Sequence, residues 1–212
     1  MLLKRKDISE CNKMGNSDAH PIRPGPQGRK YLTHDERRRV LAAAAQLPER
    51  NRLFVETLAW SGARISEALA LTPALCDLGS NSITLPTLKR RLPLTREIPL
   101  PPTLLADLDA EFDLRGRQQS TMIAEQRLWS MHRVTAWRLV KTVMEAAGIT
   151  GRQARPHGLR HAFGVGVVRA GVPITLLKRW MGHARLSSTE VYLDVIGPEE
   201  LAFAQSYWTA AG

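Results

Sequence analysis

Cysteine is scarce in this sequence, because only Cys11 and Cys76 occur among its 212 residues. The two do not form a CxxC pair and are too few for a disulfide framework, so we expect unpaired thiols and a reducing compartment. Apolar runs long enough to cross a bilayer are also lacking, and the opening MLLKRKDISE does not contain the apolar core of a signal peptide. These absences argue against a secreted disulfide-stabilised domain and a membrane protein, and favour a cytoplasmic location.

Acidic residues are a minority among the charged residues. The 20 Asp and Glu are outnumbered by 30 Lys and Arg, which gives a formal net charge of +10. The basic residues are spread along the chain, so we expect a polyanionic partner, with nucleic acid as the leading candidate. On charge alone, a merely basic soluble protein would also be credible. Hydrophobic residues make up 43% of the chain, which suffices for a real core.

The chain divides into a short basic leader and a folded region. Residues 1–30 combine basic side chains with the turn-rich segment PIRPGPQG and show no sustained apolar period, which predicts a flexible basic arm. The arm is either an unordered leader or a segment that follows phosphates. Residues 31–212 carry the periodic patterns of a folded domain.

Hydrophobic periodicity predicts mostly helices in the folded region. Thr33 followed by Glu36 forms a capping-box pattern for a helix over residues 33–46. From residue 81, Pro and β-branched residues flank the basic segment TLKRRLPLTR and indicate a small antiparallel hairpin. We therefore expect a mainly α fold with a small antiparallel β-sheet, of the α+β class. The other expected elements are helices over residues 48–62, 102–112, 130–147, 174–181 and 199–208, a helix starting near residue 157, and a polar loop over residues 113–126.

The helix expected over residues 130–147 is amphipathic, with Ser130 as its cap. Its apolar residues, Val134 and Trp137 among them, are expected to pack in the core. Trp60, on the helix expected over residues 48–62, is also expected to be buried. The polar face carries Arg133, Arg138 and Lys141. For these three residues, contact with DNA phosphates competes with the default of a solvated face.

The segment 155–192 contains the side chains best suited to phosphate chemistry: His157, Arg160, His161, His183 and Tyr192. Pro156 and the apolar positions after it predict a helix in which His157 and Arg160 share one face. Gly182 is expected to end a second helix, over residues 174–181, and to place His183 at its exit. Ser187 or Ser188 is expected to cap a third helix, which carries Tyr192. We expect the two histidines, the arginine and the tyrosine to line a common cleft.

A second group of site residues lies in SGARISEALAL. Gly62 is expected to end one helix and Arg64 to begin the next, pointing into a cleft beside helix N-terminal amides. Glu67 can hold Arg64 or a histidine in place by charge-assisted hydrogen bonding. Taken alone, Arg64 could equally be a solvated arginine at a helix start.

A metal site is the competing interpretation of the histidines, since His157 and His161 have the i,i+4 spacing of helical ligands. Arg160 between them would repel a cation, the glutamate of an HExxH motif is missing, and no carboxylate cluster follows. We therefore expect no metal and no other cofactor, and interpret His161 as a supporting or core residue.

Together, HGLRH, MGH, a tyrosine nine residues after His183, and the earlier SGARISEALAL closely resemble the catalytic boxes of tyrosine recombinases of the phage-integrase type. The resemblance runs from about residue 32 to residue 207, and four separated elements in order are far more specific than HxxR alone. It implies a site-specific recombinase that cleaves and rejoins double-stranded DNA through a 3′-phosphotyrosine intermediate. Residues 31–212 look like the catalytic domain alone, without the family's separate N-terminal core-binding domain.

The resemblance implies a role for each residue of the two motifs. Tyr192 would attack phosphorus, and Arg64 and Arg160 would clamp the non-bridging oxygens bidentately. His157 is suited to proton transfer near neutral pH, and His183 would donate a hydrogen bond to the phosphate.

The resemblance also implies a catalytic lysine in the turn of the hairpin, where Lys89 is the only lysine. Arg90 and Arg91 are rivals for the role, because the hairpin register cannot be fixed from one sequence, and both are otherwise candidates for DNA backbone contacts. The family assembles on DNA, so we expect self-association on paired sites, as a tetramer by resemblance, with accessory DNA-binding proteins as possible partners.

Two further functions stay open. A non-cleaving DNA-binding regulator could use the same scaffold, although every catalytic position is filled. A type IB topoisomerase has a similar active site, but the small size of the chain and the wording of HGLRH and MGH favour a recombinase.

Overall fold

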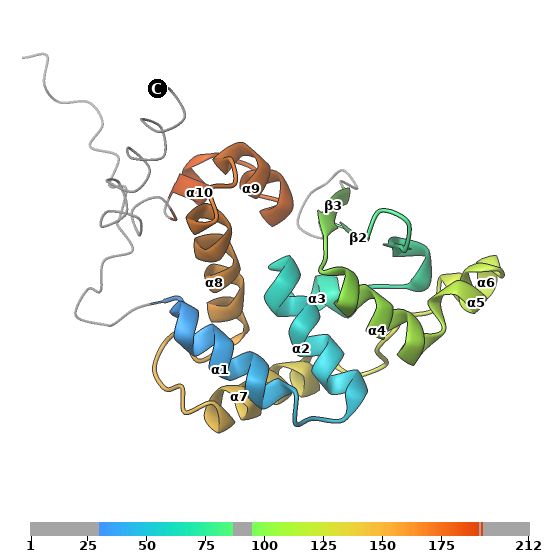
Figure 1. Cartoon of the computed structure of the whole chain (residues 1–212), viewed down its shortest axis with the longest axis horizontal. Helices are drawn as coiled ribbons and strands as arrows, with labels where there is room; N and C mark the ends of the chain where they lie inside the picture. Colours follow the sequence, from blue (N-terminus) through green and yellow to red (C-terminus); the bar gives the residue numbers. More distant parts are fainter. Residues whose placement is uncertain (1–29, 87–94, 191, 193–212) are drawn as a thin grey trace, which may run out of the picture.

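The computed structural model describes residues 30–86, 95–190 and 192, which form a mainly helical fold with a small antiparallel sheet (Figure 1). The predicted fold class is confirmed. Lys89, Arg90 and Arg91 lie outside the described residues, as do the predicted helix over residues 199–208 and all of the predicted arm except Lys30. The division into an arm and a catalytic domain stays a prediction. Across the described ranges, no helix has both the length and the apolar character of a membrane span.

Helices supply most of the described structure. In chain order they are α1 (His34–Ala44), α2 (Glu49–Ser61), α3 (Ile65–Ala68), the 3-10 helix η1 (Pro73–Leu75), α4 (Pro102–Phe112), α5 (Leu114–Gln118), α6 (Thr121–Ala124), α7 (Arg133–Ala146), α8 (Pro156–Arg169), α9 (Ile174–Met181) and α10 (Ser187–Glu190). The strands are β1 (Cys76–Asp77), β2 (Ser82–Pro86) and β3 (Thr95–Pro99). Helix α2 is central, because it packs against α1, α4 and α8.

Local sequence signals fix the ends of the first two helices. Thr33 and Glu36 form the predicted capping box of α1, since the Glu36 amide donates to Thr33 Oγ1 at 3.1 Å and the Thr33 amide donates to Glu36 Oε2 at 2.8 Å. Gly62 follows α2 in the left-handed conformation, with φ at 62°, and a Cβ there would collide with the ring of Phe163. Position 62 therefore needs glycine both for its dihedral angle and for its packing.

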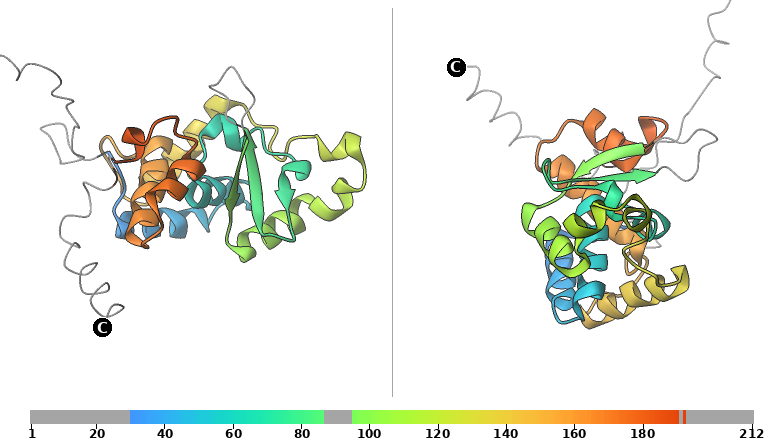
Figure 2. Two further views of the ribbon diagram at one scale, coloured as in Figure 1. Left: turned by 90° about the horizontal axis from the view of Figure 1, so that it is seen from above. Right: turned by 90° about the vertical axis from the view of Figure 1, so that its right-hand side faces the viewer.

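The strands pair antiparallel in the order β1-β2-β3, and the predicted hairpin is formed by β2 and β3. Ile83 pairs with Ile98 in that hairpin, and both are fully buried. Buried and exposed positions alternate along β3, so Arg96 faces the same side as Ile98. In the view from above in Figure 2, the strands stand between the orange region of α8 and α9 and the yellow-green region of α5 and α6.

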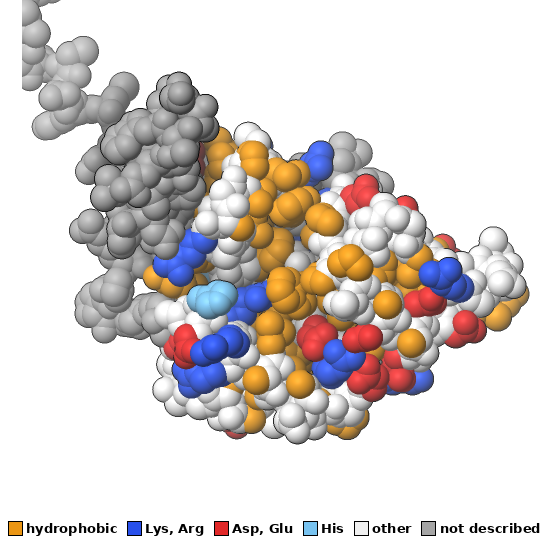
Figure 3. Space-filling view, in the orientation of Figure 1, with side chains coloured by type: hydrophobic (Ala, Val, Ile, Leu, Met, Phe, Trp, Pro, Cys, Tyr) orange, Lys and Arg blue, Asp and Glu red, His pale blue; other side chains and the backbone are white. Residues whose placement is uncertain are grey.

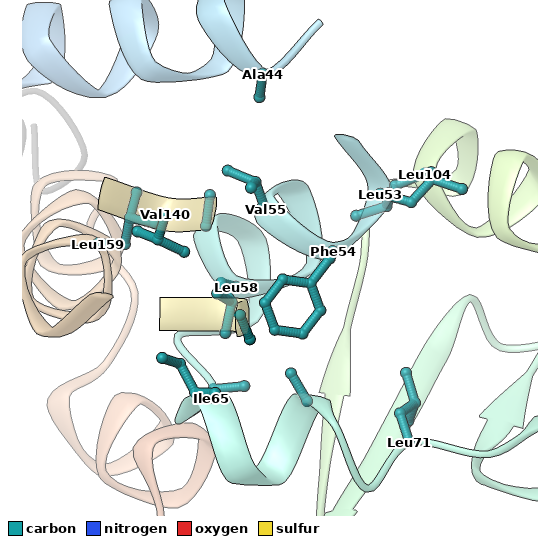
Figure 4. Close-up of a cluster of buried hydrophobic side chains, with 14 of the residues drawn as sticks. Ala44, Leu53, Phe54, Val55, Leu58, Ile65, Leu71, Leu104, Val140 and Leu159 are labelled. Carbon is teal, nitrogen blue, oxygen red and sulfur yellow. The ribbon is translucent and has the colours of Figure 1, made fainter. Parts of the chain in front are cut away.

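The main core forms where α2 meets its neighbours. Phe54, Val55 and Leu58 of α2 belong to one buried cluster with Val140 of α7 and Leu159 of α8 (Figure 4). A second buried cluster joins α8 and α9 to the side chain that follows α10; its members are Phe163, Val165, Val168, Leu177, Met181 and Tyr192. The tyrosine of the C-terminal motif is therefore part of the hydrophobic packing.

The segment 113–126 is not the loop that its polarity predicts, because it contains α5 and α6. Asp113 ends α4 in the left-handed conformation, with φ at 49°, and its carboxylate accepts a hydrogen bond from the Gly116 amide at 3.2 Å, which starts α5. Leu114 is fully buried and anchors the new turn. One buried apolar residue in each short helix, Leu114 in α5 and Ala124 in α6, is too weak a signal for periodicity to detect.

Helix α7 begins later than predicted, with His132 in place of Ser130 as its N-cap. Nδ1 of His132 accepts a hydrogen bond from the Val134 amide at 3.3 Å. Just before the helix, the buried Trp129 donates from Nε1 to the carbonyl oxygen of Arg50 at 2.8 Å. This contact holds the chain against α2, so the helix starts only beyond it.

Three apolar side chains that we expected in the core are substantially exposed: Trp60, Val134 and Trp137 are 37%, 46% and 45% accessible. Trp60 lies near the end of α2, where the guanidinium of Arg37 covers its ring at 4.1 Å from the centroid. Val134 and Trp137 lie on the first turns of α7, where Ala136 is the residue that enters the core. A helical period predicts an apolar face but not where the neighbouring elements end.

Candidate active site

Helix α8 presents His157 and Arg160 one turn apart, and Pro156 begins the helix as predicted. The guanidinium of Arg160, in a side chain that is almost fully buried, donates from Nη1 to the Gly62 carbonyl and from Nη2 to the Met181 carbonyl, both at 2.5 Å. These carbonyls lie at the C-terminal ends of α2 and α9, where the helix dipole favours a cation. Arg160 thus joins two helix ends and keeps further N–H donors for a ligand.

Arg64 precedes α3 and is held by Glu67. The Arg64 amide donates to Glu67 Oε2 at 2.8 Å, and Nη1 of its guanidinium donates to Oε1 at 2.6 Å. Glu67 is 1% exposed. Burial acts to raise the pKa of this carboxyl, but hydrogen bonds from Arg96 and Arg64 outweigh it, so the pKa lies below its ordinary value. Glu67 is therefore a carboxylate that holds both the backbone amide and the guanidinium of Arg64, while the arginine side chain stays partly exposed.

A cleft of about 340 Å³ lies between the start of α3, the first turns of α7 and the start of α8. The charged and titratable side chains that line it are all basic: Arg64, Arg133, Arg155, His157 and Arg160. The exposed Trp137 forms part of the same wall. Among the described residues that line this cleft, none is Asp or Glu, so its surface suits a phosphodiester.

The cleft brings together only part of the residue set predicted from the sequence, because His183 and Tyr192, expected in a common cleft with His157 and Arg160, are not among its lining residues. Arg155 was missed, although its place next to the predicted helix start was a usable signal. Arg133 lines the cleft, whereas Arg138 and Lys141 are not among its lining residues. Lys141 lies instead 4.0 Å from the Glu145 carboxylate, one turn further along α7.

The three histidines of the motif have lowered pKa values in the DNA-free chain. Burial lowers the pKa of His161 to about 3 and that of His183 to about 4, and neighbouring positive charges add to both effects. Burial also lowers the pKa of His157, with help from Arg160 and Arg155. At neutral pH these rings are therefore neutral, and an anion bound among them would raise their pKa values again.

His183 and Tyr192 lie together beyond the end of α9. Gly182 ends that helix in the left-handed conformation, as predicted, and His183 follows with Nδ1 at 3.0 Å from Thr189 Oγ1. The His183 ring is nearly parallel to the Tyr192 ring, with 6.4 Å between centroids. Tyr192 was predicted to lie on a helix, but α10 ends at Glu190, and the Tyr192 amide donates to the Thr189 carbonyl in a turn. Since α10 is a single short turn, the tyrosine falls past its end.

Tyr192 is seated against α8 and is only 1% exposed. Its hydroxyl lies 3.1 Å from Nδ1 of His161, and its ring covers Gly164, where an added Cβ would approach ring carbons to 2.7 Å. Burial raises the pKa of Tyr192 to about 12, against the opposing influence of Arg160 and Arg64. The nucleophile candidate is thus a neutral phenol, close to the arginines but not among the residues that line the cleft.

Sequence reasoning missed Arg96 altogether. This side chain points inward from β3, and its Nη2 donates to Glu67 Oε2 at 2.6 Å while its Nε donates to the Trp180 carbonyl at 2.7 Å. The alternation in TREIP contained a signal, because an inward Ile98 requires an inward residue 96. The basic composition of the segment hid it, since arginine is seldom fully buried.

The sequence model of the phage integrase family matches residues 30–196. The chain belongs to the phage integrase family. Tyrosine recombinase XerA of Thermococcus onnurineus, one of its relatives, is 30% identical over 169 residues, which cover 78% of this chain and 58% of that protein. The family resemblance drawn from the four motifs is confirmed, while the chain spans less than two thirds of this relative.

Solved structures of this family share the fold. The crystal structure of XerA recombinase superposes with a TM-score of 0.63 at 27% identity, over 76% of this chain and 59% of that one. XerH site-specific recombinase, bound to its difH substrate before cleavage, superposes with a TM-score of 0.65 at 20% identity, over 77% of this chain and 50% of that one. The arrangement of helices and sheet is therefore that of a phage-integrase-family recombinase.

Proposed function

We propose that this chain is a site-specific DNA recombinase that cleaves and rejoins double-stranded DNA through a 3′-phosphotyrosine intermediate. The observation that carries the proposal is the basic cleft where Arg64, His157 and Arg160 converge, with Tyr192 close enough for both arginines to act on its pKa. Membership of the phage integrase family supports the same chemistry, and the DNA-bound XerH structure of like fold supports DNA as the substrate.

In the proposed cleavage step, the phenolic oxygen of Tyr192 attacks phosphorus and the bond from phosphorus to the 5′-oxygen breaks. The tyrosine loses its proton, and the leaving 5′-oxygen gains one, for which Lys89 is the proposed donor. The phosphate stays esterified to the enzyme, so a 5′-hydroxyl of another strand can attack it and regenerate the phenol. Because the number of ester bonds is conserved, the cycle needs no ATP.

The side chains around the cleft are proposed to stabilise the charge that develops on the non-bridging oxygens. Arg64 and Arg160 supply fixed positive charge and paired donors. His157 and His183 are neutral in the free chain, and a bound phosphate would favour their protonated, donating forms. This division of roles uses arginines where a fixed charge is needed and histidines where protons move.

Attack requires Tyr192 to turn from its buried seat toward the cleft. In the seat, neutral His161 contacts the phenol through Nδ1. Once the tyrosine has turned, the neutral ring of His157, which lines the cleft, is the proposed acceptor of the phenolic proton. We propose that the turn accompanies occupation of the cleft by a phosphodiester, which brings the phosphorus that the phenol attacks. The conformation described is then the resting state.

We further propose a tetramer on paired DNA sites. Exchange between two duplexes requires four strand cuts, and this proposal assigns one nucleophile to each chain, so four copies are needed. The reaction would take place on DNA of the cytoplasmic nucleoid, with accessory DNA-binding proteins as possible further partners.

The test is covalent trapping on nicked duplexes that cover the DNA flanking the gene, analysed by denaturing electrophoresis. Wild type should form an adduct, whereas Tyr192→Phe should bind the same duplexes and form none. Adduct formation by Tyr192→Phe, or binding by wild type without any adduct, would contradict the proposal, and the second result would favour a regulator. Relaxation of supercoiled plasmid without a recombination site would instead favour topoisomerase activity.

A further inference from the structure

Arg96 connects three elements that carry parts of the proposed site. Through Nη2 it contacts Glu67, which lies in α3 and holds Arg64. Through Nε it contacts the Trp180 carbonyl near the end of α9, two residues before the glycine that leads to His183. Its side chain is 3% exposed, and it is not among the residues that line the basic cleft. Arg96 therefore reaches both sides of the site without facing the ligand.

Two arginines from different elements form hydrogen bonds with the C-terminal end of α9. Arg96 of β3 donates a hydrogen bond to the Trp180 carbonyl, and Arg160 of α8 donates one to the next carbonyl, that of Met181. Two buried cations at consecutive carbonyls complement the negative end of the helix. Helix α9 consequently cannot shift along its axis without breaking both contacts.

The turn that leads to His183 also rests on Arg96. Gly182 has φ at 62°, and a Cβ there would lie 3.2 Å from both Cδ and Nη1 of Arg96. The stem and the guanidinium of Arg96 thus pack directly against Gly182. The direction in which the chain leaves α9, and with it the position of the His183 ring, depends on this packing.

We propose that Arg96 is a positioning residue for phosphodiester cleavage, which sets Arg64 through Glu67 and His183 through the end of α9. The inference rests on the proposed function of the cleft. Without Arg96, the buried Glu67 carboxylate would retain Arg64 as its partner in the described contacts and would draw that guanidinium away from the cleft. At the same time the exit toward His183 would lose its support.

Arg52 of α2 provides a matched control. It is also a mostly buried arginine in a network of carboxylates, with Asp107 at 2.7 Å, Glu56 at 3.0 Å and Glu49 in contact. Its network lies over α2 and α4, where acidic and basic side chains interleave in Figure 3. None of these residues lines the basic cleft. Removing Arg52 should therefore weaken the fold as removing Arg96 does, without touching the site.

The test compares Arg96→Gln with Arg52→Gln, both assayed well below their melting temperatures on a duplex that the wild type cleaves. For Arg96→Gln we expect the single-turnover rate of adduct formation to fall by about 100-fold, as misplacement by an ångström can do, with the Kd for DNA within about threefold of wild type. Arg52→Gln should lower the melting temperature comparably and leave the rate unchanged. Arg96→Lys should recover part of the rate, since it keeps a cation beside Glu67 but lacks the planar fork of donors that reaches both Glu67 and the Trp180 carbonyl.

Equal rates for Arg96→Gln and wild type would overturn the inference, as would equal losses in the two glutamine variants. A second measurement needs no DNA: the side-chain NMR signal of the Arg64 Nε–H should shift in Arg96→Gln and stay in place in Arg52→Gln. An unmoved signal also counts against the inference. If wild type forms no adduct, the proposed function fails instead, and the NMR comparison still decides whether Arg96 positions Arg64.

Discussion

The hydroxyl of Tyr192 lies 3.1 Å from Nδ1 of His161, inside a seat that α8 forms with Gly164. One side chain of the HGLRH motif therefore holds the candidate nucleophile, while another, Arg160, faces the cleft. Since the His161 ring is neutral at neutral pH, its contact with the phenol is a hydrogen bond between neutral groups. The resting chain keeps its tyrosine protonated and sheltered.

His161→Ala should destabilise the fold by about 1–3 kcal/mol, because it leaves a buried phenol without its partner. Tyr192→Phe removes the other half of the pair. In a double-mutant cycle, urea denaturation should give a coupling energy of about 0.5–1.5 kcal/mol between the two substitutions. A coupling energy of zero would mean that the two groups do not interact in solution.

Gly164→Ala should push Tyr192 out of its seat, because the new Cβ would meet the ring at 2.7 Å. Nitration of Tyr192 by tetranitromethane, followed by peptide mass spectrometry, should become faster than in wild type. Gly166→Ala on the same helix is the control: its Cβ would meet nothing within 4 Å, so it should leave nitration unchanged and stabilise α8 by up to about 1 kcal/mol. Equal nitration rates of Tyr192 in the two variants would contradict the packing of its ring against Gly164.

Arg64→Ala and Arg160→Ala should both slow adduct formation by about 100- to 1,000-fold while changing DNA affinity modestly. Their folding costs should differ. Arg160→Ala leaves two buried carbonyls without this donor and should cost about 2–4 kcal/mol, whereas Arg64→Ala leaves Glu67 paired with Arg96 and should cost less. Parallel measurements of adduct rate, Kd and urea denaturation check this, and equal losses in rate and affinity would reduce either arginine to a simple anchor.

Acid should destabilise this chain through His161 and His183. Their folded pKa values of about 3 and about 4 lie below the ordinary 6.5, so between pH 6.5 and pH 4 the unfolded chain binds protons that the folded chain does not. The stability that they contribute is present above pH 6.5 and falls as the pH falls through that window. Urea denaturation from pH 8 to pH 4.5 should show this loss, with a shallower slope in His183→Gln. An unchanged slope in that variant would remove His183 from the explanation.

Signals that act within a few residues were predictable from the sequence. The capping box of Thr33 and Glu36, the left-handed glycines at positions 62 and 182, and the i,i+3 pair of His157 and Arg160 depend only on local geometry. The same holds for the contact of Glu67 with Arg64, three positions apart. Local rules therefore gave most helices and most of the cleft.

Features that depend on distant partners were not predictable. Whether Trp137 is buried depends on where other elements end, and Arg96 is stabilised inside by Glu67 and the Trp180 carbonyl, 29 and 84 residues away. The contact between Tyr192 and His161 likewise spans 31 residues. No periodicity in a single segment encodes such pairings, because the stabilising group lies in another part of the chain.

The contact between Arg160 and the Gly62 carbonyl has a consequence for biosynthesis, since the two residues are 98 positions apart. At ordinary rates of translation, the end of α2 is made roughly 5–20 seconds before the arginine that caps it. For nearly all of that interval the nascent chain contains Arg64 and Glu67 but lacks Arg160, α9 and the tyrosine. On the proposed function, a nascent chain that stops before Tyr192 therefore lacks the nucleophile and cannot form the covalent intermediate with DNA.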